Sequence, residues 1–125
     1  ALIDKRRYAP NKAEIVNLVG DLENRDVIII DDMIDTAGTT VNAAEKAVEN
    51  GARSVIGVAT HALLSGEAIE RLKKSPIKQF IFTDTVHVPE EKILPNMRFV
   101  TVSGIFGEAI RRIYKGESVS ALFNF

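Results

Sequence analysis

The sequence predicts a single α/β domain in which helices flank a parallel sheet. Short runs of β-branched residues alternate with segments whose apolar residues recur at helical spacing. This strand–helix–strand order implies right-handed crossovers and a sheet with helices on both faces. The length of 125 residues, with 46% hydrophobic and 26% charged residues, fits one folded domain over residues 1–125.

The amino-terminal segment carries three predicted features. Residues 1–4 have the pattern of the second half of a strand, as if the chain began inside a larger architecture. Residues 5–10 form a basic stretch that ends at Pro10. Residues 11–22 are predicted to form an amphipathic helix from the spacing of four apolar residues, Ile15, Leu18, Val19 and Leu22.

Two strands with a helix between them form the predicted centre of the domain. Residues 27–30 are all β-branched, which is typical of a parallel strand buried on both faces. The helix that follows is predicted from the spacing of Val41, Ala44 and Val48. Asn50 and Gly51 supply its stop, and residues 54–59 are the second buried strand.

A short helix and a third strand come next. Ser65 is expected to be the N-cap of this helix, with Ile69 and Leu72 pointing inward. The helix must end before Pro76, whose ring does not fit a helix interior. Residues 79–83 are then predicted to form the third strand.

The last third of the chain predicts an irregular connection at residues 87–97 and a fourth strand at residues 99–102. Ser103 is expected to cap a final helix that ends at Gly116. Three of its residues are expected to face the core, namely Ile105, Ala109 and Ile113.

Composition excludes several classes of function. The net charge of −1 gives no general attraction to nucleic acid or to anionic membranes, so neither is expected as a partner. The chain has no cysteine, which excludes disulfide scaffolds, cysteine zinc sites and cysteine nucleophiles. The longest apolar run has four residues, and no signal-peptide pattern opens the sequence. We therefore expect a cytoplasmic protein.

The most informative segment is residues 31–40, directly after the first central strand. Asp31 and Asp32 leave the strand, and residues 35–39 stand where a helix begins. A helix N-terminus offers backbone N–H groups and partial positive charge, and Gly38 lets a ligand approach closely, which suits phosphate. Carboxylates instead accept sugar hydroxyls or bind Mg²⁺. The pattern points to a sugar 5-phosphate, although Asp35 as a plain N-cap and a solvated acidic turn remain the alternative.

Charge gives this segment a second requirement. Residues 21–35 contain six acids and one base, a local charge of −5 that repels anions. The basic residues Lys5, Arg6 and Arg7 meet this requirement if their strand lies beside the central one, because their loop then opens on the same sheet edge. An ordinary solvated basic patch is the alternative.

Residues 28–40 resemble the phosphoribosyl pyrophosphate (PRPP) motif of type I phosphoribosyltransferase-like folds. Further segments resemble the ribose-phosphate pyrophosphokinase family, in order along almost the whole chain: residues 3–7, 50–52, 60–66, 108–113 and 117–123. The resemblance implies transfer of the diphosphoryl group of ATP to the 1-hydroxyl of ribose 5-phosphate, with Mg²⁺ as cofactor. It also implies a homo-oligomer.

The resemblance assigns roles to individual residues. The 5-phosphate would be held by Asp35, Thr36, Ala37, Gly38 and Thr39. Asp31 and Asp32 would face the ribose hydroxyls and the associated Mg²⁺. Lys5 and Arg7 match the basic residues of a flexible catalytic loop. Ser118, Ser120 and Phe123 match a tail that contributes to an allosteric site, with an edge strand over the core as the alternative.

The resemblance covers only the carboxyl-terminal one of the family's two similar domains. The other half supplies most ATP-binding residues and a metal-binding histidine, which neither His61 nor His87 replaces by position. No metal ligand is therefore predicted in this chain, and the chain alone is expected to be inactive. His61 follows a strand end and is expected to be structural, with ligand contact as the alternative.

Three other functions remain open. A regulatory or scaffolding relative would keep the fold without catalysis. A transferase that consumes PRPP would share the same motif. A phosphorylatable receiver domain has a similar length, but it needs a carboxylate at the end of a later strand, where this chain has Ala59, Thr60 and His61.

Overall fold

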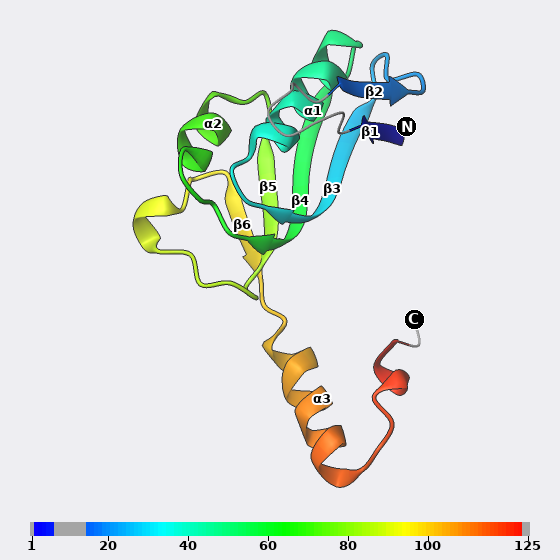
Figure 1. Cartoon of the computed structure of the whole chain (residues 1–125), viewed down its shortest axis with the longest axis vertical. Coiled ribbons are helices and arrows are strands. Elements are labelled where there is room, and N and C mark those ends of the chain that lie inside the picture. The colour runs from blue at the N-terminus through cyan, green and yellow to red at the C-terminus, as the bar shows by residue number, and fades with distance from the viewer. Residues whose placement is uncertain (1, 7–14, 124–125) are drawn as a thin grey trace.

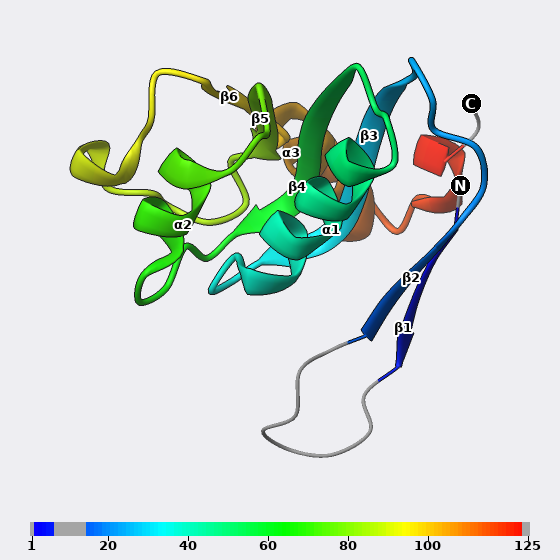
Figure 2. The same cartoon turned by 90° about the horizontal axis from the view of Figure 1, so that it is seen from above.

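The structure, a computed structural model, describes residues 2–6 and 15–123. Its body is a four-stranded parallel sheet in the order β3-β4-β5-β6 (Figure 1). These strands are β3 (Asp26–Ile34), β4 (Ser54–Ala62), β5 (Gln79–Thr83) and β6 (Met97–Val100). Helices α1 (Gly38–Glu49) and α2 (Ala68–Lys74) cover one face of this sheet (Figure 2). The predicted α/β fold class is confirmed.

The core lies between this sheet face and the two helices. Phe80 and Phe82 on β5 are fully buried, and their rings stack at a centroid distance of 6.2 Å. Gly57 on β4 makes room for them, because a Cβ at Gly57 would lie 3.0 Å from the Phe80 ring. From α1 and α2, the small side chain of Ala44 and the larger one of Leu72 complete the packing. The aromatic residues thus set how closely the strands and helices approach.

The opposite sheet face is not covered as predicted. Ile28 is 60% exposed and Ile30 is 77% exposed, although both belong to the β-branched run of residues 27–30. Val27 and Ile29 alternate with them and point toward α1, where Ile29 is buried. Within the described residues, β3 is therefore a strand buried on one face only, and the expectation of a doubly covered strand is wrong.

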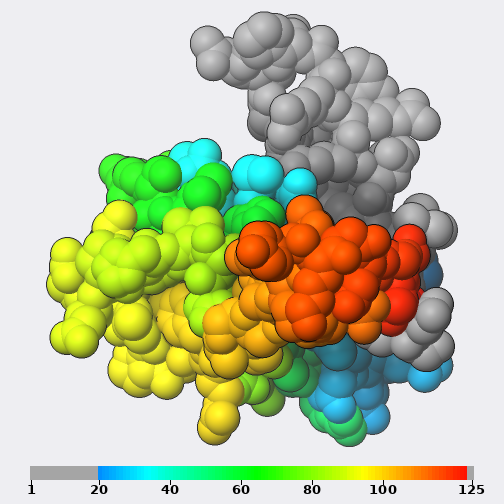
Figure 3. Space-filling view, turned by 90° about the horizontal axis from the view of Figure 1, so that it is seen from below, coloured from blue at the N-terminus to red at the C-terminus, as the bar shows by residue number. Residues whose placement is uncertain are grey.

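Helix α3 (Ser103–Lys115) extends past the end of β6 (Figure 1). Seen from below, the orange surface of this segment lies in front of the rest of the molecule (Figure 3). None of its residues is buried, so the expectation that Ile105, Ala109 and Ile113 face the core is wrong. Its N-cap is Val102 rather than Ser103. The predicted stop is confirmed: Gly116 has φ 69°, a left-handed conformation that glycine adopts readily.

The predicted helix at residues 11–22 is also wrong. Residues 15–19 instead form β2 (Ile15–Val19), which pairs antiparallel with β1 (Leu2–Arg6) in a separate two-stranded sheet. Three of the five β2 residues are β-branched, and such residues favour strands. Residues 7–14 lie outside the described residues.

Several boundaries move while the elements remain. Strand β5 has the predicted bounds, whereas β3 and β4 are longer than predicted and β6 begins and ends two residues earlier. Helix α2 begins at Ala68, and Ser65 does not cap it. Ser65 instead donates its backbone N–H to the carbonyl of Asp35. The connection predicted at residues 87–97 is irregular up to Asn96, apart from one 3₁₀ turn, Glu90–Lys92, because Met97 already belongs to β6.

Candidate functional site

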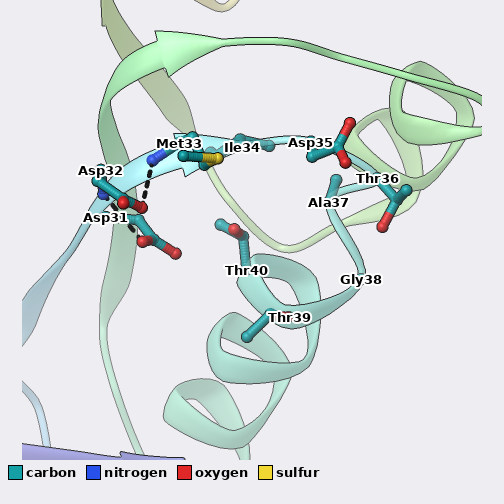
Figure 4. A pocket seen from close by; sticks show the side chains of 10 residues that line it. All are labelled: Asp31, Asp32, Met33, Ile34, Asp35, Thr36, Ala37, Gly38, Thr39 and Thr40. Carbon is teal, nitrogen blue, oxygen red and sulfur yellow. Dashed lines mark hydrogen bonds between the residues drawn. The ribbon is translucent and has the colours of Figure 1, made fainter. Parts of the chain in front are cut away.

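A pocket with a volume of about 380 Å³ lies where β3 turns into α1 (Figure 4). It is lined by Asp31, Asp32, Met33, Ile34, Asp35, Thr36, Ala37, Gly38, Thr39 and Thr40. Ligand pockets commonly have volumes of about 300–1,000 Å³ and, in open α/β sheets, lie at the carboxyl ends of strands. The structure therefore brings together the whole acidic segment that the sequence singled out.

The segment that leads from the end of β3 into α1, residues 34–37, is held by hydrogen bonds to four successive carbonyl groups. The Ile34 carbonyl accepts the N–H groups of Leu63 and Leu64 at 3.0 and 3.1 Å. The Asp35 carbonyl accepts the N–H of Ser65 at 3.0 Å. The Thr36 carbonyl accepts Nη1 of Arg71 at 3.2 Å. The Ala37 carbonyl accepts the N–H of Val41 at 3.0 Å. These bonds tie the loop to the end of β4, to α2 and to the first turn of α1.

The carbonyl contacts determine where the loop amides point. In a planar trans peptide, the C=O and the following N–H point in opposite directions. Carbonyls turned toward β4 and α2 therefore turn the N–H groups of Thr36 and Ala37 to the other side, and the N–H of Gly38 points out of the N-terminus of α1. Converging amides at a helix N-terminus form an anion-binding concavity. This backbone can bind a phosphate group.

Ala37 holds the central position of the loop. It is 4% exposed and has φ 63° and ψ −1°, in the left-handed region that costs a residue with a Cβ about 1–2 kcal/mol. Its methyl group is buried in the core cluster. A strained backbone conformation persists only where the surrounding structure holds it, and the packing around the Ala37 methyl group does so here.

Asp31 and Asp32 form the acidic lip of the pocket (Figure 4). One oxygen of Asp31 accepts the N–H of Asp32 at 2.9 Å, and one oxygen of Asp32 accepts the N–H of Met33 at 2.8 Å. Each carboxylate is thereby fixed through one oxygen, so its second oxygen has a defined direction. Carboxylate oxygens so placed can accept hydroxyl groups or bind Mg²⁺.

Arg71 is a site residue that the sequence did not predict. It lies on α2, and its Nη1 donates to the Thr36 carbonyl. Its Nη2 lies 3.4 Å from Glu67, the N-cap residue of the same helix. Residues 36 and 71 meet only because α1 and α2 pack on the same sheet face, and no spacing or motif in the sequence marks that meeting.

The basic residues predicted for the catalytic loop are not placed at the pocket by sheet pairing. Lys5 lies on β1 and pairs with Val16 of β2, so the condition that its strand lies beside the central strand β3 is not met in the described sheets. Arg7 lies outside the described residues. Their catalytic role remains a prediction from the resemblance.

The predicted allosteric residues follow α3. Ser120 and Phe123 lie in a 3₁₀ helix, η2 (Ser120–Phe123), so the alternative of an edge strand is wrong. Phe123 is 69% exposed, and the Ser118 carbonyl accepts Nη1 of Arg112 at 3.0 Å. The tail is thus attached to α3 and presents an aromatic ring at the surface.

An ion-pair network stiffens α3. Glu108 accepts hydrogen bonds from Arg111 at 2.7 and 2.8 Å and from Arg112 at 2.8 Å. Arg111 also contacts Glu117, 3.0 Å away. The hydrogen bonds from Arg111 and then Arg112 hold the pKa of Glu108 at about 2. Glu108 therefore stays ionised over the physiological range and anchors both guanidinium groups.

His61 has a structural partner. Its Nδ1 lies 2.7 Å from Oγ1 of Thr85, and that hydroxyl donates to the Thr60 carbonyl at 3.1 Å. His61 is only partly exposed and does not line the pocket at residues 31–40. This contact favours the structural role over ligand binding.

The described residues contain neither a ready-made metal cluster nor a membrane-spanning helix. Among them, no cluster of three or more His, Cys, Asp or Glu side chains is arranged to hold a metal ion. Mg²⁺ commonly needs only one or two carboxylates when the substrate supplies further oxygens, so the carboxylates of Asp31 and Asp32 fit that ion. None of the described helices combines the length and apolar character needed to span a membrane.

Comparison with known proteins identifies relatives of the chain. A family model described as the phosphoribosyl synthetase-associated domain matches residues 5–124. The ribose-phosphate pyrophosphokinase of Caldanaerobacter subterraneus subsp. tengcongensis is 51% identical over 123 residues, which are 98% of this chain and 39% of that protein. The Bacillus cereus protein of the same name is 49% identical over 124 residues, 99% of this chain and 39% of its own length.

A solved structure agrees with these sequence relatives. The crystal structure of phosphoribosylpyrophosphate synthetase from Mycobacterium smegmatis has a TM-score of 0.78 and 33% identity to this chain. The match covers 86% of this chain and 35% of that one. The chain thus spans less than half the length of the relatives that it matches.

Proposed function

Since this chain belongs to the phosphoribosyl synthetase-associated domain family, we propose that it is the part of a PRPP synthetase that binds ribose 5-phosphate. The observation that carries this proposal is the segment at residues 34–37, whose four carbonyl groups all accept hydrogen bonds from other parts of the chain. Such a loop accepts an anion without any basic side chain in the pocket lining.

The pocket matches the two ends of this substrate. The amides of residues 36–39, at the start of α1, receive the 5-phosphate, and the Thr36 and Thr39 hydroxyls lie on the same loop. The carboxylates of Asp31 and Asp32 lie at the other end of the lining and accept the ribose hydroxyls. The sugar is then held by both ends, with its 1-hydroxyl available for reaction.

The reaction proposed for the full-length protein transfers a diphosphoryl group. The oxygen of the ribose 1-hydroxyl forms a bond to the β-phosphorus of ATP, the bond from that phosphorus to AMP breaks, and the hydroxyl proton is released. Lys5 and Arg7 are proposed to stabilise the charge of the transferring group. Bound Mg²⁺ would neutralise charge on the diphosphoryl oxygens.

The length of the relatives limits what this chain does alone. The match covers 39% of the first relative, so the ATP site and most catalytic groups are proposed to lie in sequence that this chain does not contain. We expect the 125 residues to bind ribose 5-phosphate without turning it over. Release of AMP from ATP and ribose 5-phosphate by the purified chain would contradict that expectation.

Assembly and regulation are proposed on the same basis. The tail residues Ser118, Ser120 and Phe123 are proposed to contribute to an allosteric phosphate or nucleotide site in a homo-oligomer. The exposed Phe123 ring supports this assignment, because an aromatic side chain at the surface suits an interface between subunits.

Calorimetric titration with ribose 5-phosphate and Mg²⁺ tests the binding proposal. The test variant is Gly38→Asp, which adds a carboxylate at the first residue of α1. An acid there suits the helix dipole, and the Arg71 guanidinium that would lie 3.2 Å from the new Cβ is the end of a flexible side chain that can turn aside, so folding is retained. Repulsion of phosphate by the new carboxylate, together with the displaced guanidinium, weakens binding by about a hundredfold. The matched control is Ser103→Asp, at the first residue of α3 and outside the pocket.

Three results are decisive. Binding by the wild type and by Ser103→Asp, but not by Gly38→Asp, supports the proposal. Equal binding by all three proteins places the site elsewhere. A folded wild type that binds neither ribose 5-phosphate nor inorganic phosphate contradicts the proposal and favours a scaffolding relative.

A further inference from the structure

Arg71 lies against the outer side of the phosphate loop. Its Nη1 is 3.2 Å from the Thr36 carbonyl oxygen and would lie 3.2 Å from a Cβ placed on Gly38. The guanidinium therefore touches the loop where it enters α1, and the missing side chain of Gly38 makes this approach possible. The pocket lining contains three carboxylates, from Asp31, Asp32 and Asp35, and no basic residue.

The contact falls on the peptide that precedes Ala37, one of three described non-glycine residues with a positive φ, the others being Asn24 and Leu64. Ala37 has φ 63° and ψ −1°, close to the third position of a type II turn, which glycine usually occupies. A flip of the peptide between Thr36 and Ala37 would give a type I turn, with a negative φ at Ala37 and less strain. The flip would also turn the Thr36 carbonyl into the pocket and the Ala37 N–H out of it.

We propose that Arg71 is a positioning residue that holds the Thr36–Ala37 peptide with its N–H toward the phosphate. This inference rests on the proposed binding of a sugar phosphate at the same loop. The neighbouring carbonyls of Asp35 and Ala37 are held by backbone amides, from Ser65 and Val41. The Thr36 carbonyl is held by a side chain, so this peptide depends on Arg71 in a way that its neighbours do not.

A different role for Arg71 makes a separate prediction. If its charge simply attracted the phosphate, the conformation of Ala37 would not matter. If Arg71 instead acts by holding the Thr36 carbonyl, its charge strengthens that hydrogen bond, because a charged donor bonds more strongly than a neutral one. The two roles are separated by changing the strain at residue 37 and the guanidinium independently.

The first test needs no ligand. The three-bond coupling between HN and Hα, together with the Cα and Cβ chemical shifts, reports the sign of φ at Ala37 by NMR. In Arg71→Met, which keeps the aliphatic stem but not the donor, we expect Ala37 to move toward negative φ. Arg71→Ala serves as the second variant, should Arg71→Met misfold. An unchanged φ at Ala37 in a folded Arg71 variant overturns the inference.

Glu67→Gln is the matched control for this experiment. It removes the carboxylate that lies 3.4 Å from Nη2 and leaves the guanidinium in place. Because the bond to Thr36 is made through Nη1, Ala37 should keep its positive φ in this variant. A change as large as that in Arg71→Met would mean that the ion pair, and not the Thr36 contact, holds the loop, which also overturns the inference.

The second test is a double-mutant cycle with Ala37→Gly, read as the dissociation constant for ribose 5-phosphate. We expect Arg71→Met to weaken binding by about tenfold or more in the wild-type background. In the Ala37→Gly background the loss should be clearly smaller, because glycine adopts the left-handed conformation without strain.

The outcomes separate this inference from the proposed function. An equal loss in both backgrounds shows that Arg71 acts by charge alone and overturns the inference, while the binding proposal stands. Absence of binding by the wild type contradicts the binding proposal, and the φ measurement at Ala37 still decides whether Arg71 holds the peptide.

Discussion

Oδ1 of Asp31 accepts the backbone N–H of Asp32 at 2.9 Å, so the first acid of the lip orients the second. The same relationship then links Asp32 to Met33 at 2.8 Å. In the strand register, the pairs Asp31–Ala59 and Met33–His61 are present and flank Asp32. The lip is thus built by the acids themselves within β3, whose pairing with β4 resumes at Met33 and Ile34.

Loss of one charge from the acidic lip should affect the affinity for ribose 5-phosphate and the affinity for inorganic phosphate differently. Asp32→Asn keeps the size of the side chain but replaces one carboxylate oxygen with an amide. We expect ribose 5-phosphate to bind about tenfold more weakly, because a charged acceptor of the hydroxyl groups is lost. Inorganic phosphate should bind as tightly or more tightly, because one repelling charge is gone. Calorimetric titration with each ligand measures both effects.

Asp21→Asn is the control for that comparison. Asp21 belongs to the same acidic stretch, but it is exposed and does not line the pocket. Its replacement should leave the affinity for ribose 5-phosphate nearly unchanged. Equal weakening by both variants would mean that overall charge, and not the lip, governs binding.

Gly57 should tolerate no larger residue while Phe80 is present. A Cβ at Gly57 would lie 3.0 Å from Cδ1 of Phe80, so Gly57→Ala overpacks the core and costs about 1–3 kcal/mol of unfolding free energy. Adding Phe80→Leu relieves the clash, so the double variant should lose less than the sum of the two single losses. Urea denaturation measures all three values, and strictly additive losses would contradict the predicted contact.

The stability of α3 should depend on acid pH. The pKa of Glu108 is lowered from 4.5 to about 2 by the hydrogen bonds of Arg111 and Arg112. A lowered pKa means that the stabilising effect is complete above about pH 4.5 and is lost as the pH falls toward 2. The carboxyl ¹³C shift of Glu108 should therefore titrate near 2, and a midpoint near 4.5 would contradict the network.

Glu108→Gln is the control for this titration. The variant removes the ionised acceptor and keeps the side-chain length, so the helical signal of α3 should become less sensitive to pH between about 4.5 and 2. An unchanged pH dependence of helicity in Glu108→Gln would assign the effect to other acids.

The open sheet face should promote self-association of the isolated chain. Ile30 pairs in register with Val58, and Val58 with Ile81, so three apolar residues form one row across this face. Exposed contiguous apolar surface favours association. We expect Ile30→Glu to shift the weight-average mass toward the monomer in sedimentation equilibrium.

Val48→Glu is the matched control, because Val48 is also an exposed apolar residue but lies on α1. It should leave the association constant unchanged. If Val48→Glu dissociates the assembly as much as Ile30→Glu does, the row on the sheet face is not the interface.

Local pattern predicted the elements whose neighbours lie nearby in the sequence. Residues 79–83 form a strand with the predicted bounds. The strand predicted at residues 27–30 instead continues to Ile34, so Asp31 and Asp32 lie within β3 rather than after it, and only residues 35–37 separate β3 from α1. The four apolar residues at positions 15, 18, 19 and 22 suit a helix by spacing. Residues 15–19 form a strand because they pair with β1, and this pairing cannot be predicted from the local pattern of apolar residues.

Tertiary placement explains the other differences. The β-branched run at residues 27–30 predicted a strand correctly, but only packing reveals that Ile28 and Ile30 face an open side. Similarly, the amphipathic pattern of α3 predicted a helix correctly without showing where its apolar side lies. Arg71 lies 35 residues from Thr36 in the sequence, and the two residues meet only because α2 packs beside α1, so the sequence did not predict the contact.

Amide NMR during titration with ribose 5-phosphate tests the central proposal most directly. The proposal predicts that the largest shifts occur at residues 36–39, with smaller changes at Asp31 and Asp32. Shifts confined to the separate pocket lined by Asp84 and Phe106, or the absence of any shift at residues 36–39 with the ligand in large excess, would contradict a sugar-phosphate site at the start of α1.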